Sequence, residues 1–236
     1  MSYKEFDVSG IGKIKIYKRK NNRSLRLTVA ADGAVRLTMP LWTPYQVGLA
    51  FTHAKRDWIS AQSHRRTRPL FVNGMRIGKS HHLVLQRGQT TTPVKTALQQ
   101  TTVTVTYSIN ADSADELVQV AVEAACLRAL RRQATSLLKQ RLNQLALTHE
   151  LAYSHLAIKR MKGRWGSCDQ NHNIVLNLFL VQLPWELIDY VILHELTHTK
   201  VLRHGEPFWS ELEKVVPKAR QLRKAIKMYH PAIYVA

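Results

Sequence analysis

The feature of the sequence that most constrains the fold is an apolar segment after Pro184 that contains two histidines four residues apart. Residues 190–198 read Tyr-Val-Ile-Leu-His-Glu-Leu-Thr-His, and their apolar majority predicts a helix packed into a core. Successive helical residues are rotated by about 100°, so His194 and His198 lie one turn apart on the same face. The chain is therefore expected to direct both imidazoles at one point.

This arrangement is suited to binding a metal ion. Two imidazoles one helical turn apart can both reach a Zn²⁺ ion at about 2.0–2.1 Å. Glu195 follows the first histidine and can accept a proton from a water molecule that zinc has acidified. The alternative is a core helix that happens to contain two histidines, but chance occurrences of His-Glu-x-x-His are rare. We expect His194 and His198 to be metal ligands and Glu195 to be the general base.

A catalytic zinc needs a third protein ligand, and His204 is the first candidate. On a continuous helix its side chain would point away from the other two histidines. The helix must therefore end first, and the chain must fold back within residues 200–203. Gly205 suits such a turn because glycine tolerates unusual backbone angles. Glu206 and Glu211 are alternative third ligands.

The chain is strongly basic. It contains 35 Lys and Arg against 16 Asp and Glu, a formal charge of +19. Such a charge attracts polyanions, so nucleic acid is a possible partner, although a solubilising surface explains the charge equally well. The sequence contains neither a long apolar run nor an apolar segment in residues 1–10, and only two cysteines. We expect no membrane partner and a reducing cytoplasm as the location.

The pattern of apolar residues changes near residue 110. Residues 1–110 are rich in strand patterns, of which 101–109 is the clearest, whereas a long helical pattern begins at Ser113. Residues 155–165 and 173–178 predict a β-hairpin. We therefore expect an α+β fold with two parts: a β-rich N-terminal region, 1–110, packed on a helical catalytic domain, 111–236, with a small antiparallel sheet.

Six segments of the second half form a recognisable pattern: Gly163–Cys168, Asn173–Asn177, Leu183–Pro184, Ile188–Val191, His194–His198 and His204–Trp209. This pattern resembles a known family, the YgjP-like metallopeptidase-type hydrolases, which are related to the SprT-like zincins. The likeness is strongest over residues 159–212 and extends to features such as Arg23–Arg26 near the N-terminus. The resemblance implies a zincin-like catalytic domain, zinc held by three histidines, and a catalytic glutamate.

Other residues near the motif have two readings each. Arg164 and Trp165 are expected on a strand that borders the cleft, where Arg164 can bind a substrate carboxylate or phosphate or stabilise an oxyanion. Cys168 is not needed as a nucleophile if a metal supplies hydroxide. Asn177 either orients a ligand or caps a turn. Asp189 can accept a hydrogen bond from a ligand imidazole, although a position on the helix surface is the simpler expectation.

Three functions fit these features. The leading hypothesis is a zinc metallopeptidase in which water activated by Glu195 attacks a peptide carbonyl. The second is a nucleoside triphosphate hydrolase, for example of UTP, which uses the same site with Zn²⁺, Mn²⁺ or Mg²⁺. The third is a nucleic-acid-binding module with a structural zinc, suggested by the positive charge.

Overall fold

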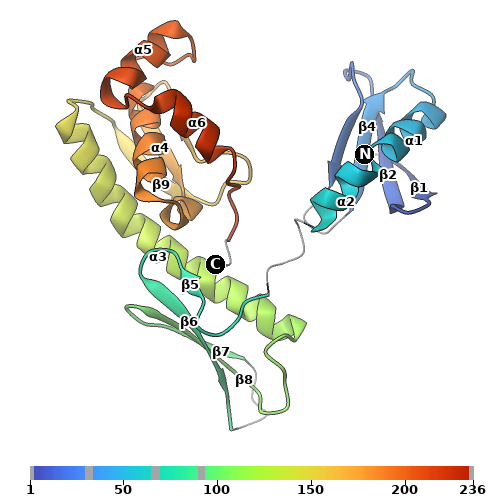
Figure 1. Cartoon of the computed structure of the whole chain (residues 1–236), viewed down its shortest axis with the longest axis horizontal. Coiled ribbons are helices and arrows are strands. Elements are labelled where there is room, and N and C mark those ends of the chain that lie inside the picture. Colours follow the sequence, from blue (N-terminus) through green and yellow to red (C-terminus); the bar gives the residue numbers. More distant parts are fainter. Residues whose placement is uncertain (1–2, 30–33, 65–69, 90–93, 234–236) are drawn as a thin grey trace. The chain divides into compact units, whose positions relative to one another are not determined.

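The computed structural model describes residues 3–29, 34–64, 70–89 and 94–233. The chain forms two compact units, Met1–Pro69 and Leu70–Ala236 (Figure 1). The boundary lies about forty residues before the one that we predicted at residue 110, because the strands between residues 70 and 110 share a core with the helices that follow them.

The N-terminal unit is a four-stranded sheet packed against two helices. The strand order is β1-β2-β4-β3, with β2 and β4 parallel. Inward-facing residues such as Ile14, Ile16, Leu37 and Met39 are fully buried, as the period-two alternation of a half-buried strand requires. The elements are β1 (Lys4–Val8), β2 (Gly12–Arg19), β3 (Arg26–Val29), β4 (Val35–Pro40), α1 (Tyr45–Ala54) and α2 (Arg56–His64).

The C-terminal unit begins with a second four-stranded sheet, of order β5-β6-β8-β7. The strand predicted at 101–109 is β8, and its residues Val103 and Val105 are fully buried. The sheet packs against the long helix α3 (Glu116–Thr148), so a β-rich composition did not mark a separate domain here. The strands are β5 (Arg76–Ile77), β6 (His81–Arg87), β7 (Lys95–Leu98) and β8 (Thr102–Tyr107).

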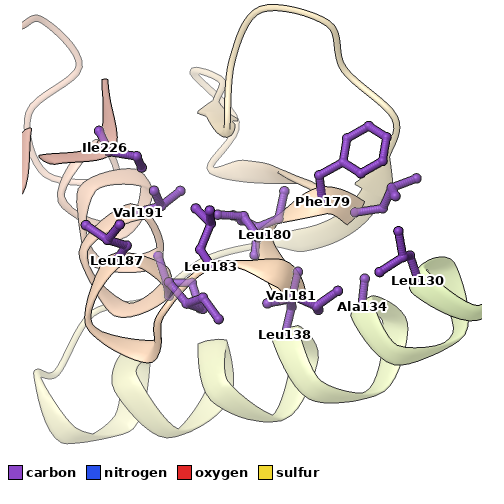
Figure 2. Close-up of a cluster of buried hydrophobic side chains, with 14 of the residues drawn as sticks. Leu130, Ala134, Leu138, Phe179, Leu180, Val181, Leu183, Leu187, Val191 and Ile226 are labelled. Atoms are coloured by element: carbon purple, nitrogen blue, oxygen red, sulfur yellow. The ribbon is translucent and has the colours of Figure 1, made fainter. Parts of the chain in front are cut away.

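Helix α3 supports the part of the unit that contains the candidate site. Its buried face, which includes Leu130, Ala134 and Leu138, contacts the 3-10 helix η1 (Leu178–Gln182) and helix α4 (Trp185–Thr197). Figure 2 shows Leu180 and Val181 of η1 between the two helices. Pro184 precedes the first turn of α4, where the missing N–H of proline costs no helical hydrogen bond. The histidine helix is therefore anchored on one side by a continuous apolar core.

A three-stranded sheet lies beside α4, with β9 (His155–Lys159), β10 (Gly166–Cys168) and β11 (Asn173–Asn177) in the order β10-β11-β9. The hairpin expected between residues 155–165 and 173–178 is wrong in its first strand, because β9 pairs with β11 in parallel and the hairpin partner of β11 is β10. The sheet is therefore mixed, not wholly antiparallel, because the loop after β9 carries the chain to the other edge of β11. The α+β fold class is confirmed.

Two short helices complete the unit, α5 (Glu206–Val215) and α6 (Ala219–Ile226). Pro217 separates them, as expected of a residue that cannot donate a helical hydrogen bond. Both helices pack against each other, and each packs against α4. Of the helices in the described ranges, none combines the length and the apolarity that spanning a bilayer requires.

Candidate metal centre

Three imidazoles converge where α4 ends. The Nε2 atom of His204 lies 2.9 Å from Nε2 of His194 and 3.1 Å from Nε2 of His198. These three residues form a group of potential metal ligands in the described part of the chain. His194 and His198 reach this point because they occupy one face of α4, one turn apart.

His204 reaches the same point because the chain reverses after α4, as the sequence required. Helix α4 ends at Thr197, and turns formed by residues 198–203 lead to Gly205, the N-cap of α5. The alternative ligands are engaged elsewhere. Glu206 accepts hydrogen bonds from Arg220, and Glu211 pairs with Lys214. The turn therefore brings an exposed histidine, His204, to the other two imidazoles.

Phe208 contacts all three imidazoles. Its ring is fully buried, and its centroid lies 4.8 Å from those of His194 and His204 and 4.5 Å from that of His198, on which it stacks. Nδ1 of His194 is buried and has no hydrogen-bond partner among the described residues, so no hydrogen bond orients the ring through this atom. Phe208 therefore fixes the relative positions of side chains that come from two separate segments.

The donor set fits a divalent cation. Nδ1 of His198 lies 3.1 Å from the carbonyl of Val201 and donates to it, which leaves a lone pair on Nε2. Burial lowers the pKa of His194 to about 3, and it also lowers the pKa values of His198 and His204, so all three imidazoles are neutral. The three ligand nitrogens lie within 4.8 Å of one another, and one Zn²⁺ at about 2.0–2.1 Å from each would accept all three lone pairs.

Glu195 lies next to this centre in a confined environment. Its side chain is buried, and burial raises its pKa to about 8, while the charge of Arg164 lowers that pKa. The carboxylate rests on Gly166 of β10. A Cβ atom at position 166 would lie 2.5 Å from Oε1 and 2.6 Å from Cγ of Glu195. Only glycine therefore allows the strand and the glutamate to approach so closely.

The loop before β10 is held by one buried amide. Asn177 is fully buried, and its Nδ2 donates to the carbonyls of Met161, at 2.7 Å, and Arg164, at 2.8 Å. Its Oδ1 accepts from the N–H of Phe179. Asn177 therefore caps η1 and shapes the loop that carries Arg164, which resolves the two readings of this residue in favour of the turn.

Arg164 and Trp165 lie in that loop, not on the strand where we expected them, because β10 begins only at Gly166. Arg164 is exposed, whereas the ring of Trp165 packs partly against the core of the unit. The close approach of Gly166 to Glu195 was not predicted. Its signal in the sequence is a glycine at the start of a strand, which often marks a close approach of the backbone to another group.

Asp189 and Cys168 have structural roles and not catalytic ones. Asp189 does not contact a ligand imidazole; its two carboxylate oxygens accept hydrogen bonds from Arg141 of α3, both at 2.6 Å. The pKa of the Cys168 thiol is raised to about 11 by burial and by the charge of Glu195. A thiol with such a pKa is protonated at neutral pH, as expected of a cysteine without a nucleophilic role.

A helix with the His-Glu-x-x-His pattern, a third histidine from the next segment and a buried glutamate beside them define the class of metal-dependent hydrolases. The comparison with protein families agrees. Residues 23–229 match the family described as YgjP-like, metallopeptidase domain. The chain belongs to this family, which confirms the resemblance seen in the sequence, and it is a metal-dependent hydrolase.

Two solved structures are similar to part of the chain. One is the metallopeptidase zymogen abylysin of Pyrococcus abyssi, with 24% identity, a TM-score of 0.36, and coverage of 39% of this chain and 92% of that chain. The other is the zymogen jannalysin of Methanocaldococcus jannaschii, with 28% identity, a TM-score of 0.35, and coverage of 39% and 88%. No curated protein matches the chain.

Proposed function

We propose that the protein is a zinc metallopeptidase in which His194, His198 and His204 hold the metal and Glu195 is the general base. The observation that carries this proposal is the buried carboxylate of Glu195 beside three converging Nε2 atoms. When bound, a divalent cation polarises a carbonyl and acidifies water.

The chain's own residues then perform the proton transfers. Glu195 accepts a proton from the attacking water and later donates it to the leaving amine, which general acid–base chemistry requires of one well-placed group. Burial raises the pKa of Glu195, which favours the protonated form that donates to the leaving amine, whereas the charge of Arg164 favours the carboxylate. Gly166 packs against this group, and Phe208 packs against the three ligand imidazoles.

A peptide substrate is supported by the edge strand at the site. Strand β10 is the outer strand of its sheet and packs against α4, and its first residue, Gly166, lies against Glu195. No other described strand pairs with the outer edge of β10. An extended peptide can add to such an edge through main-chain hydrogen bonds, which would bring a scissile carbonyl next to Glu195.

A nucleotide substrate has weaker support. A shallow basic cavity of about 530 Å³ is lined by Lys159, Lys162 and Arg164 together with Ser167 and Val175. Successive strand residues point to opposite faces, so Ser167 faces away from the side on which Gly166 meets Glu195. A phosphate bound beside Ser167 would therefore lie on the face of the sheet opposite the general base, although the charge of Arg164 reaches Glu195.

The decisive experiment compares the zinc-loaded wild type with Glu195→Gln on casein and peptide panels and on a nucleoside triphosphate panel that includes UTP. We expect peptide hydrolysis in the wild type and a loss of roughly 10²-fold or more in Glu195→Gln, the size of effect typical of general acid–base groups. Glu206→Gln is the matched control, because this exposed glutamate near the site pairs with Arg220 instead.

Three outcomes contradict the proposal. Phosphate or pyrophosphate release from the nucleotides without peptide hydrolysis would show that the site hydrolyses nucleotides and not peptides. Salt-sensitive nucleic-acid binding, with no activity that depends on Glu195, would favour a structural zinc. Stoichiometric zinc retained by a His194→Ala, His198→Ala double mutant, measured by elemental analysis, would remove the metal assignment.

A further inference from the structure

Two arginines of α6 lie against one aromatic ring beside the metal centre. The guanidinium carbons of Arg220 and Arg223 are 5.5 and 4.8 Å from the centroid of Trp209. Trp209 is nearly buried, and its ring centroid lies 6.4 Å from that of His194. Both arginines therefore have similar contacts with a side chain that borders the histidines.

The two arginines differ in their charge partners. Arg220 forms ion pairs with Glu213, at 2.7 Å, and with Glu206, at 3.2 Å. Arg223 has no carboxylate partner in the described part of the chain, and its side chain is exposed. The intramolecular charge of Arg220 is thus already balanced, whereas the guanidinium of Arg223 keeps donors that face solvent.

Trp209 links Arg223 to the metal centre. The guanidinium carbon of Arg223 lies 4.8 Å from the centroid of Trp209, and that centroid lies 6.4 Å from the centroid of His194. The ring centroids of His194 and His204 are 5.0 Å apart. Arg223 therefore lies beside the part of the metal centre that His194 and His204 form.

We propose that Arg223 is a specificity-determining residue whose guanidinium binds a carboxylate of the substrate on the His194–His204 side of the centre. Arginine presents paired donors that match a carboxylate, and Trp209 holds its planar group in place. The carboxylate comes either from an acidic side chain or from the free C-terminus of the substrate. The inference rests on the proposed function, because it requires a peptide substrate at the metal centre.

Binding measurements test the role without relying on turnover. The probes are acetylated alanine octapeptides with one Glu or one Gln at each position in turn, each prepared as the free acid and as the amide. Their affinities for the zinc-loaded Glu195→Gln protein are measured by calorimetry. The same titrations are repeated with Arg223→Ala or Arg220→Ala added. Arg220→Ala is the matched control, since it removes the same contact with Trp209.

We expect one acidic peptide to bind about tenfold or more tightly than its neutral counterpart, the effect of a charge-assisted hydrogen bond. The preference should disappear in Arg223→Ala, persist in Arg220→Ala and remain in part in Arg223→Lys, with zinc content unchanged. A preference for one Glu position identifies a side chain, and a preference for the free acid identifies the C-terminus.

The proposal is overturned if the parent protein shows no preference, including no measurable binding, or if Arg223→Ala keeps the preference. In the active protein, Arg223→Ala should raise KM for the preferred peptide more than it changes kcat. Binding preference without any peptide cleavage would reject the peptidase and retain Arg223. Cleavage without a preference for acidic peptides would retain the peptidase and reject the role of Arg223.

Discussion

Gly166→Ala is the sharpest perturbation of the proposed general base, because it adds one methyl group against a single functional group. The new Cβ would lie 2.5 Å from Oε1 and 2.8 Å from Cδ of Glu195, whereas an ordinary contact begins at 3.4 Å. The carboxylate or the strand must therefore shift by about 0.9 Å, the difference between 3.4 and 2.5 Å. Gly166 does not have a positive φ, so alanine brings no backbone strain of its own.

The expected cost follows from that displacement. A misplacement of about 1 Å at a reacting group can reduce the rate roughly 10²-fold, which corresponds to about 2.7 kcal/mol in the activation free energy. We expect kcat for a cleaved peptide to fall by this amount, while zinc content and secondary structure remain those of the wild type. Gly163→Ala is the control in the same loop, because a Cβ there meets no atom within 4 Å.

A double-mutant comparison shows whether the loss passes through Glu195. Glu195→Ala lacks the atoms that the new methyl group would displace, so adding Gly166→Ala should change its residual rate less than about twofold. Wild-type kcat in Gly166→Ala with zinc bound would refute the reasoning. A large further loss in the Glu195→Ala background would show that position 166 acts in another way.

Three further predictions concern the support of the site. Gln133→Leu should lower the free energy of unfolding by about 3 kcal/mol in denaturant titrations. The reason is that this buried amide accepts hydrogen bonds from the N–H groups of Lys79 and Ser80 and donates to the Ile77 carbonyl. A loss below about 1 kcal/mol would contradict this prediction. Burial lowers the pKa of His81, so the unfolded chain binds a proton at a higher pH than the folded chain does. The free energy of unfolding should therefore fall from about pH 7.5 to about pH 5.5, by at most about 1.4 kcal/mol per pH unit from this group. In His81→Leu the free energy of unfolding should fall less steeply, and equal slopes in the two proteins would reject the assignment. Asp189→Asn should cost about 1 kcal/mol through its half-exposed pair with Arg141 and leave zinc stoichiometry unchanged; loss of zinc would restore a role for Asp189 at the metal.

Local sequence was sufficient for the elements whose signal lies within one segment. The periodicity of residues 184–198 predicted α4 and placed His194 and His198 on one face, because helical geometry relates residues i and i+4 without help from the rest of the chain. The strand β8 and the long helix α3 were predicted for the same reason. The need for a reversal before His204 also followed, since only a turn can return that side chain to the others.

Contacts between segments that are distant in the sequence could not be predicted from local patterns. The parallel partnership of β9 with β11, and the union of β5–β8 with α3 in one core, depend on contacts between residues far apart in sequence. Composition near residue 110 consequently suggested a boundary that the packing moved to Pro69–Leu70. Periodicity reports which face of an element is apolar, but it does not report which other element covers that face.

The sequence alone determined which atoms could bind a metal and which carboxylate stands beside them. Only the tertiary structure decided what surrounds those atoms: Gly166 against Glu195, Phe208 against three imidazoles, and Arg223 against Trp209. The physical reason is that the two kinds of information depend on residues at different separations along the chain. Ligand spacing is set by the helical repeat, whereas burial, and with it the pKa of each group, is set by side chains that folding brings from other segments.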